Sequence, residues 1–201
     1  MKPKLFLQLT VALAACCAQG QGTFIYDQQS GTNGTGGGGS IIQAFQTVGQ
    51  SFTPTLSSVE FVQLEFADGH PGNSLGATVY VNLWSGSISN GTLLSSTEPV
   101  FMPDGFLAIT NFFFLTPASV MPGTTYYLQP YVQSGDMWGV IDATYNYPGG
   151  TAIFNGNPNV NLDLQFSEGV IAVPEPSPAM MILFAILLVQ ILRRKQKETH
   201  H

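Results

Sequence analysis

Hydrophobic and polar side chains alternate along most of the middle of the chain. The clearest runs are residues 59–66 and 78–84; in the first, Val62, Leu64 and Phe66 share one face while mainly polar side chains take the other. An alternation with a period of two residues is typical of strands that bury one face and expose the other. The pattern therefore predicts half-buried antiparallel strands.

Further short apolar runs, separated by turn residues, extend this pattern over the whole central region. The additional strands that we expect are residues 23–27, 106–115, 124–132, 137–144, 151–154 and 161–166. Reversals are signalled by Asn90-Gly91, Pro103-Asp104-Gly105, Met121-Pro122-Gly123 and Asn155-Gly156. The two Asn-Gly pairs are tight-turn signals of the type found in hairpins. Many short strands with regular turns predict an all-β fold, an antiparallel, jelly-roll-like β-sandwich over residues 41–169. Residues 21–40 are expected to be a first strand followed by a flexible glycine-rich loop.

The first 20 residues have the charged, apolar and small-residue order of a secretory signal peptide, a substrate of the Sec translocon. Cleavage after Gly20 fits this order. An alternative stays open, because Leu13-Ala14-Ala15-Cys16 resembles a bacterial lipobox, which would make Cys16 a lipidated N-terminus. Both cysteines of the chain, Cys16 and Cys17, lie in this leader, so the predicted sandwich has no disulfide.

The C-terminal end has three successive parts. A proline-rich spacer occupies residues 170–178, an apolar run without charge, proline or glycine fills residues 179–192, and a basic tail occupies residues 193–201. Alternate prolines hold the spacer extended. The apolar run predicts a transmembrane helix of about 21 Å, shorter than a hydrocarbon core of about 30 Å, which side chains that snorkel and local thinning can accommodate. The cluster Arg193, Arg194 and Lys195 would stop transfer and stay cytoplasmic.

This order of parts, with the motif Val173, Pro174, Glu175 and Pro176 at its start, resembles the PEP-CTERM sorting signal of Gram-negative bacteria. The resemblance implies an exported protein that is held in the inner membrane as a precursor by its C-terminal helix. It further implies processing near Pro-Glu-Pro by an exosortase-type membrane enzyme, and delivery to the cell surface or extracellular matrix. Residues 50–54, 79–86, 122–128 and 147–152 also resemble the sandwich domain of many PEP-CTERM surface proteins and are similar to some carbohydrate-binding modules.

The distribution of charge excludes several classes of function. All 6 Lys and Arg residues lie at positions 2, 4, 193, 194, 195 and 197, whereas all acidic residues except Glu198 lie between these ends. A region without Lys or Arg has no electrostatic footprint for nucleic acid and no clamp for phosphate. No salt bridge is expected within this region, so that apolar burial and backbone pairing must stabilise it. No cofactor is expected apart from structural calcium, for which Asp136 and Asp142 are candidate ligands.

Aromatic side chains are the candidates for ligand binding. Four of them could stack on exopolysaccharide if they face solvent together: Trp84, Trp138, Tyr145 and Tyr147. A core position is the competing interpretation, above all for Trp84.

Catalysis is not expected, because His70 is interpreted as an exposed turn residue and nothing in the sequence places a pair of carboxylates at the distance that a hydrolase needs. Such pairs would be Glu60 with Glu65 or Asp136 with Asp142. The leading hypothesis is a non-enzymatic surface or matrix protein; its alternatives are a carbohydrate-binding module and, more distantly, a glycoside hydrolase.

Overall fold

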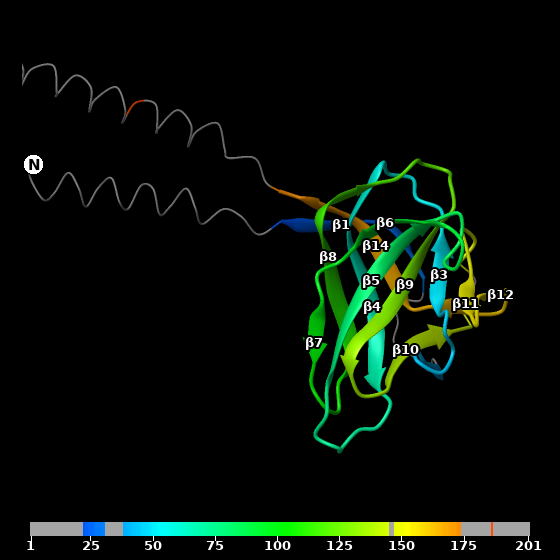
Figure 1. Ribbon diagram of the computed structural model, residues 1–201. Coiled ribbons are helices and arrows are strands. Elements are labelled where there is room, and N and C mark those ends of the chain that lie inside the picture. The colour runs from blue at the N-terminus through cyan, green and yellow to red at the C-terminus, as the bar shows by residue number, and fades with distance from the viewer. Residues whose placement is uncertain (1–21, 31–37, 145–146, 174–185, 187–201) are drawn as a thin grey trace, which may run out of the picture. The chain divides into compact units, whose positions relative to one another are not determined.

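The computed structural model describes residues 22–30, 38–144, 147–173 and 186. Within them, a compact unit from Phe24 to Ile171 forms an all-β sandwich of two sheets (Figure 1). The predicted all-β class and β-sandwich are thereby confirmed. Several predictions lie outside the described residues: the signal peptide with Cys16, residues 31–37 of the glycine-rich loop, the motif from Pro174 onwards, and the apolar run and basic tail except for Ile186.

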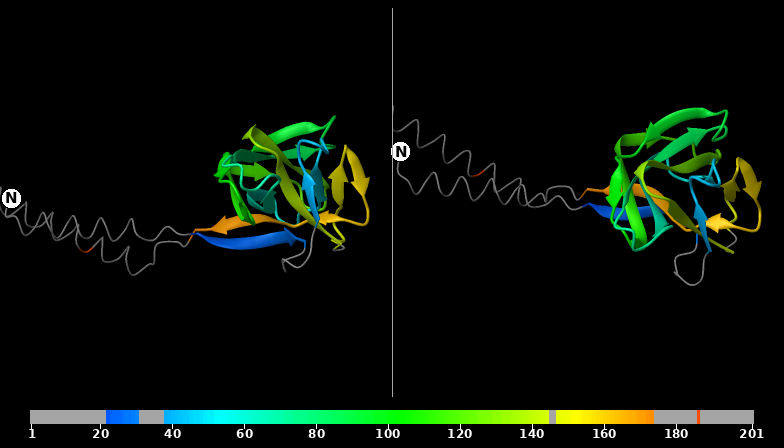
Figure 2. Two further views of the ribbon diagram at one scale, coloured as in Figure 1. Left: turned by 90° about the horizontal axis from the view of Figure 1, so that it is seen from below. Right: turned by 60° about the horizontal axis from the view of Figure 1, so that its bottom comes forward.

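The first sheet contains the strands from both ends of the unit. Its main path runs β1-β14-β4-β10-β13, with β2 added to β10 and β8 added to β4. In Figure 2, β1 and β14 run side by side, so the first and last strands share one sheet. The bounds are β1 Thr23–Gln29, β2 Gly38–Ile41, β4 Ser58–Asp68, β8 Leu107–Ser119, β10 Trp138–Ala143, β13 Asp163–Leu164 and β14 Phe166–Ala172.

The second sheet is built from the intervening segments. Its path is β12-β11-β3-β9-β5-β6, and β7 also pairs with β5. The bounds are β3 Gly49–Phe52, β5 Ala77–Ser85, β6 Thr92–Ser96, β7 Val100–Met102, β9 Tyr126–Gly135, β11 Ala152–Phe154 and β12 Asn157–Asn159. The paired strands for which a residue register is defined are antiparallel in both sheets, for example β5 with β9 and β4 with β8.

The core lies between the two sheets and follows from the alternation in the sequence. Val62, Leu64 and Phe66 of β4 are fully buried together, as the pattern predicts. A bulge between Val59 and Phe61 changes the phase of the strand, which places Phe61 opposite Phe113 of β8, a residue that is 40% exposed. Large apolar side chains replace ion pairs as the main source of stability. The largest buried ones include Trp138, Phe52, Phe66, Phe112, Leu64, Leu83, Leu128 and Leu164.

The described end of the predicted glycine-rich loop is a strand. β2 pairs with β10 in the register Gly38–Asp142 and Gly39–Ile141. A Cβ at Gly38 would lie 3.4 Å from an Asp142 carboxylate oxygen, so the glycine leaves room for this carboxyl at close strand approach. Backbone pairing with β10 offsets the conformational entropy that led us to expect a flexible loop.

The two Asn-Gly turn signals have different outcomes. Asn155 and Gly156 have φ angles of 53° and 74°, the left-handed pair that a tight hairpin turn between β11 and β12 requires. Gly91 instead closes a longer loop between β5 and β6, in which its backbone N–H donates to the carbonyl of Ser87 at 3.1 Å. The first signal is confirmed as a two-residue turn and the second only as a reversal.

Helical structure contributes little to the described chain. Ile186 is helical and 52% exposed. Among the residues that the structure describes, no helix has the length and apolarity needed to cross a membrane.

Candidate functional site

Among the described residues, the aromatic side chains chosen from the sequence do not form a common platform. Trp138 is fully buried in the core, and Tyr147 is only 7% exposed, so neither ring has a face free for a sugar, which corrects that prediction. Trp84 is partly buried, and its indole N–H donates to Oε1 of Gln129 at 2.8 Å. Tyr145 lies outside the described residues.

Tyr147 is a buried structural link between segments that are distant in sequence. Its hydroxyl donates to Oε1 of Gln28 at 2.8 Å and accepts from the backbone N–H of Thr53 at 3.4 Å. Its ring packs edge-on against Phe166 at 5.2 Å between centroids. A Cβ at Gly149 would collide with the Tyr147 hydroxyl, so the glycine that suggested an exposed turn is what lets the ring lie under the chain.

The two candidate calcium ligands lie near opposite ends of β10 and do not converge. Asp142 is buried and its Oδ2 accepts from the Ser40 hydroxyl at 2.7 Å. Asp136 precedes the strand, about 20 Å away at about 3.3 Å per residue. Within the described part of the chain, no three His, Cys, Asp or Glu side chains gather as metal ligands.

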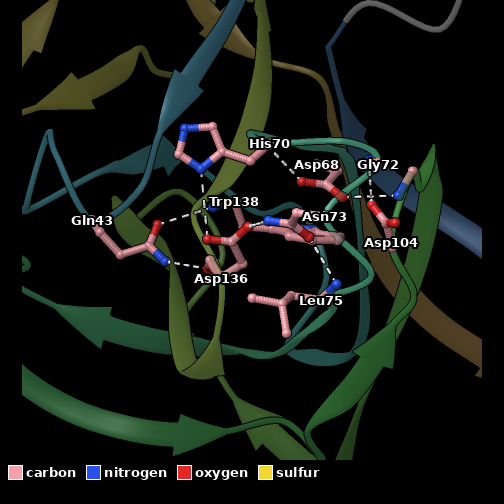
Figure 3. A network of polar contacts seen from close by, with 10 residues as sticks. Gln43, Asp68, His70, Gly72, Asn73, Leu75, Asp104, Asp136 and Trp138 are labelled. Atoms are coloured by element: carbon pink, nitrogen blue, oxygen red, sulfur yellow. Dashed lines mark hydrogen bonds and ion pairs between the residues drawn. The ribbon is translucent and has the colours of Figure 1, made fainter.

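Asp136 belongs to a polar network at the loop between β4 and β5 (Figure 3). Its carboxylate accepts from the side-chain amide of Asn73, and it lies 3.7 Å from Nδ1 of His70. His70 is 55% exposed in its side chain, as predicted for a turn. When protonated, it forms an ion pair with Asp136, which corrects the expectation that this region has no salt bridge. The nearby Gln43 amide donates to the backbone carbonyl of Asp136 at 2.7 Å.

Two further aspartates close the same loop through backbone amides. Asp104 accepts from the N–H groups of Gly72 at 2.7 Å and Ser74 at 2.8 Å, as Figure 3 shows in part. Asp68 accepts from those of His70 at 2.7 Å and Gly105 at 2.8 Å. The Gly72 and Ser74 N–H groups hold the pKa of Asp104 below its ordinary value. Both carboxylates accept hydrogen bonds from backbone N–H groups of the loop, so this network holds the loop in its conformation.

The proposed carboxylate pairs for hydrolysis are also separated. Glu60 and Glu65 are five residues apart on β4, or about 16 Å along the strand, whereas a retaining glycosidase needs about 5 Å. Glu60 instead accepts from the backbone N–H of Ile171 at 3.0 Å. Asp136 and Asp142, described above, are no closer.

A different pair of carboxyls has contrasting electrostatics. Burial and, to a smaller extent, the neighbouring charge of Asp27 together raise the pKa of Glu168 to about 8. Asp27 has a lowered pKa because Thr55 and the backbone N–H of Leu56 donate to it, which outweighs its partial burial. Such a split is typical of an acid and a nucleophile. Glu168 is nevertheless fully buried, out of reach of a substrate, so the pair belongs to the packing of β1 and β14.

The outer face of the first sheet carries a groove that the sequence analysis did not identify. It is an open hollow of about 280 Å³ that crosses β1, β14, β4 and β8. Its lining consists of amides, hydroxyls and a few apolar side chains: Tyr26, Gln29, Ser30, Gln63, Ile109, Gln165, Phe166 and Ser167. The available signal was β8, whose outward positions are unusually apolar; Ile109 is 58% and Leu115 79% exposed.

No protein-family model matches this chain, and no curated protein matches it in sequence.

Proposed function

We propose that this chain is an exported, non-enzymatic protein of the bacterial cell surface or extracellular matrix, sorted through its PEP-CTERM-like C-terminus. In this proposal, a signal peptide directs the chain to the Sec translocon. The C-terminal helix holds the precursor in the inner membrane, and an exosortase-type enzyme processes it at Pro174, Glu175 and Pro176.

The observation that carries this proposal is that the first and last strands of the folded unit begin and end next to the two expected processing sites. β1 begins at Thr23, three residues after the expected cleavage at Gly20. β14 ends at Ala172, and Val173 directly precedes Pro-Glu-Pro. Removal of both terminal segments would therefore leave every described strand intact, as a processed export substrate requires.

The proposed fold of the delivered domain is jelly-roll-like. Two features support this assignment. The first and last strands lie in the same sheet, and strands that are far apart in sequence, such as β3 and β9, pair with each other. The mainly structural role of the domain is supported by its carboxylates, since Asp27, Asp68 and Asp104 accept hydrogen bonds from backbone amides of neighbouring loops.

A triple substitution of Pro174, Glu175 and Pro176 by alanine tests the sorting role in a host with exosortase. We expect the variant to stay in the membrane fraction as a longer precursor, while the wild type is released. Glu98→Ala is the matched control, because Glu98 is an exposed glutamate that also precedes a proline. Release of the triple variant at the wild-type rate and mass would reject the proposal.

Carbohydrate binding is the second candidate function, and the groove on the outer face of the first sheet is the observation that favours it.

A further inference from the structure

The groove lies where rows of outward-facing side chains cross the first sheet. Ser167 of β14, Gln63 of β4 and Asn111 of β8 stand in one cross-strand row. The Gln63 amide donates to Oδ1 of Asn111 at 2.7 Å, which orients the remaining amide groups of both side chains across the sheet. Side chains on paired strands are neighbours at about 5 Å, so this row forms a continuous polar strip.

An aromatic cluster borders this strip. Phe61 is covered by Phe24 at 4.5 Å and by the edge-on ring of Tyr26 at 5.6 Å between centroids, and Phe113 lies opposite Phe61 on β8. Tyr26 remains 47% exposed at the groove and has no hydrogen-bond partner for its hydroxyl among the described residues. A half-exposed ring, fixed by aromatic neighbours, is available for stacking.

Two polar groups of this region lack partners within the described chain. Gln165 lines the groove, and its side-chain amide has no hydrogen-bond partner among the described residues but is not one of the fully buried unpartnered groups, so it is accessible from the groove. Glu65 lies directly across from Ile109, a groove residue, and its Oε2 atom is buried without a partner. The amide of Gln165 is therefore available to a ligand in the groove, whereas the buried Oε2 of Glu65, which does not line the groove, is not.

We propose that this groove binds a short segment of an uncharged polysaccharide. A sugar ring offers an apolar face for Tyr26 and hydroxyls that both donate and accept hydrogen bonds, which match the amides of Gln63, Gln165 and Asn111. The groove volume of about 280 Å³ is close to the lower end of the range for small-molecule sites, about 300–1,000 Å³. This inference deepens the second candidate function, carbohydrate binding, by naming the class of glycan and the residues that bind it, and it does not depend on the route of export.

The charge of the region selects against other occupants. The chain has no Lys or Arg between positions 4 and 193, and Glu65 lies beside the groove, so an anionic polysaccharide would meet repulsion without a counter-charge. A neutral glycan has no such cost.

Isothermal titration of the full chain with soluble neutral β-glucan and α-glucan oligosaccharides tests this site. The chain is kept in a zwitterionic detergent, because detergents with sugar head groups would compete. We expect binding of one of these neutral series and none of oligogalacturonate. Tyr26→Ala should weaken the affinity about threefold to tenfold, and Gln63→Ala in the polar strip should weaken it as well.

Tyr131→Ala is the matched control, because Tyr131 is a 42% exposed tyrosine of the second sheet, away from the groove. We expect it to leave the affinity unchanged, and the melting temperature of each variant should show that it is folded at the temperature of the titration. Failure of the wild type to bind any neutral series would overturn the proposal, as would equal losses in Tyr26→Ala and Tyr131→Ala. Formation of a dimer that Tyr26→Ala dissociates would assign the face to self-association instead. Export and processing would be unaffected by either result, so the two proposals fail separately.

Discussion

Buried carboxyls dominate the chemistry of this domain at the scale of single residues. Without Lys or Arg nearby, they rely on neutral donors: Asp163 accepts from the Gln50 amide at 2.9 Å and the Tyr147 backbone N–H at 2.7 Å. Asp142 receives one bond from Ser40. Burial raises the pKa of both aspartates. Glu168 has no hydrogen-bond partner for either oxygen within the described residues and should be protonated at neutral pH.

Glu168→Gln should reduce the dependence of stability on pH. Between the ordinary pKa of 4.5 and the folded value of about 8, the folded chain keeps a proton that the unfolded chain releases. The free energy of unfolding therefore falls as the pH rises through this window. Glutamine is neutral throughout, so we expect a melting temperature about 3 °C or more above wild type near pH 8, and little difference near pH 4.

Glu98→Gln provides the control, because it makes the same change from a carboxyl to an amide at an exposed site. Its melting temperature should follow the wild type at both pH values. Equal stabilisation by Glu168→Gln near pH 4 and pH 8 would show that ionisation of Glu168 is not responsible.

The residues of the site were less predictable from sequence than the strands. Trp138 begins β10, a strand buried on both faces, where alternation cannot separate inward from outward positions. Tyr147 has turn residues after it, but the missing side chain of Gly149 lets the chain close over the ring. The groove needs residues from four strands in one register, which no local pattern specifies.

At the scale of elements, the turn between β11 and β12 depends on its glycine. Gly156→Ala would place a side chain at a φ of 74°, which costs about 1–2 kcal/mol. The new Cβ would also lie 3.3 Å from Oγ1 of Thr47. We expect chemical denaturation to show a loss of stability of that size.

Gly139→Ala is the control for the turn, since its Cβ would have ordinary contacts, the nearest at 3.5 Å, and its φ is not in the left-handed region. A smaller loss is expected there. If Gly156→Ala were as stable as wild type, the tight turn would not require its glycine.

The loop between β4 and β5 should depend on the Asp104 carboxylate. Asp104→Asn replaces a two-oxygen anionic acceptor, so the amides of Gly72 and Ser74 should exchange hydrogen about tenfold faster. The lowered pKa of Asp104 means that its contribution is present above the ordinary value of 3.8 and is lost as the pH falls through the folded value. Wild-type loop protection should therefore decrease in strong acid.

Amide exchange at Leu83, in the buried part of β5, is the internal control and should not change. Equal acceleration at Leu83 and Gly72 would mean that the variant destabilises the whole domain.

Prediction of the strands from sequence succeeded where a strand buries one face and exposes the other. It failed where a segment is a strand only because a neighbouring strand supplies its backbone hydrogen bonds. The alternation of residues 59–66 and 78–84 corresponds to β4 and β5, which are longer by a few residues. β2 has two glycines in its four residues and exists because β10 supplies hydrogen bonds. The predicted strand over residues 161–166 is divided into β13 and β14, which pair with different neighbours.

At the scale of the whole molecule, the described domain is acidic without basic side chains other than His70. Its carboxylates repel one another more when they are close in the folded state than in the unfolded chain. Raising NaCl from about 20 to 300 mM at pH 7 should therefore raise the melting temperature by about 2–5 °C. The same change near pH 4 should have a smaller effect, because many carboxylates are then neutral. Destabilisation by salt at pH 7 would contradict this account.

The division of charge between the middle and the ends is also the basis of the proposed export. The most direct test is the intact mass of the protein recovered from the surface or medium of a Gram-negative host with exosortase. We predict a chain that begins at Gln21 and ends close to Pro-Glu-Pro, without the apolar run and Arg193, Arg194 and Lys195. Recovery of a chain that retains this basic cluster, only in the cells, would contradict the proposed sorting.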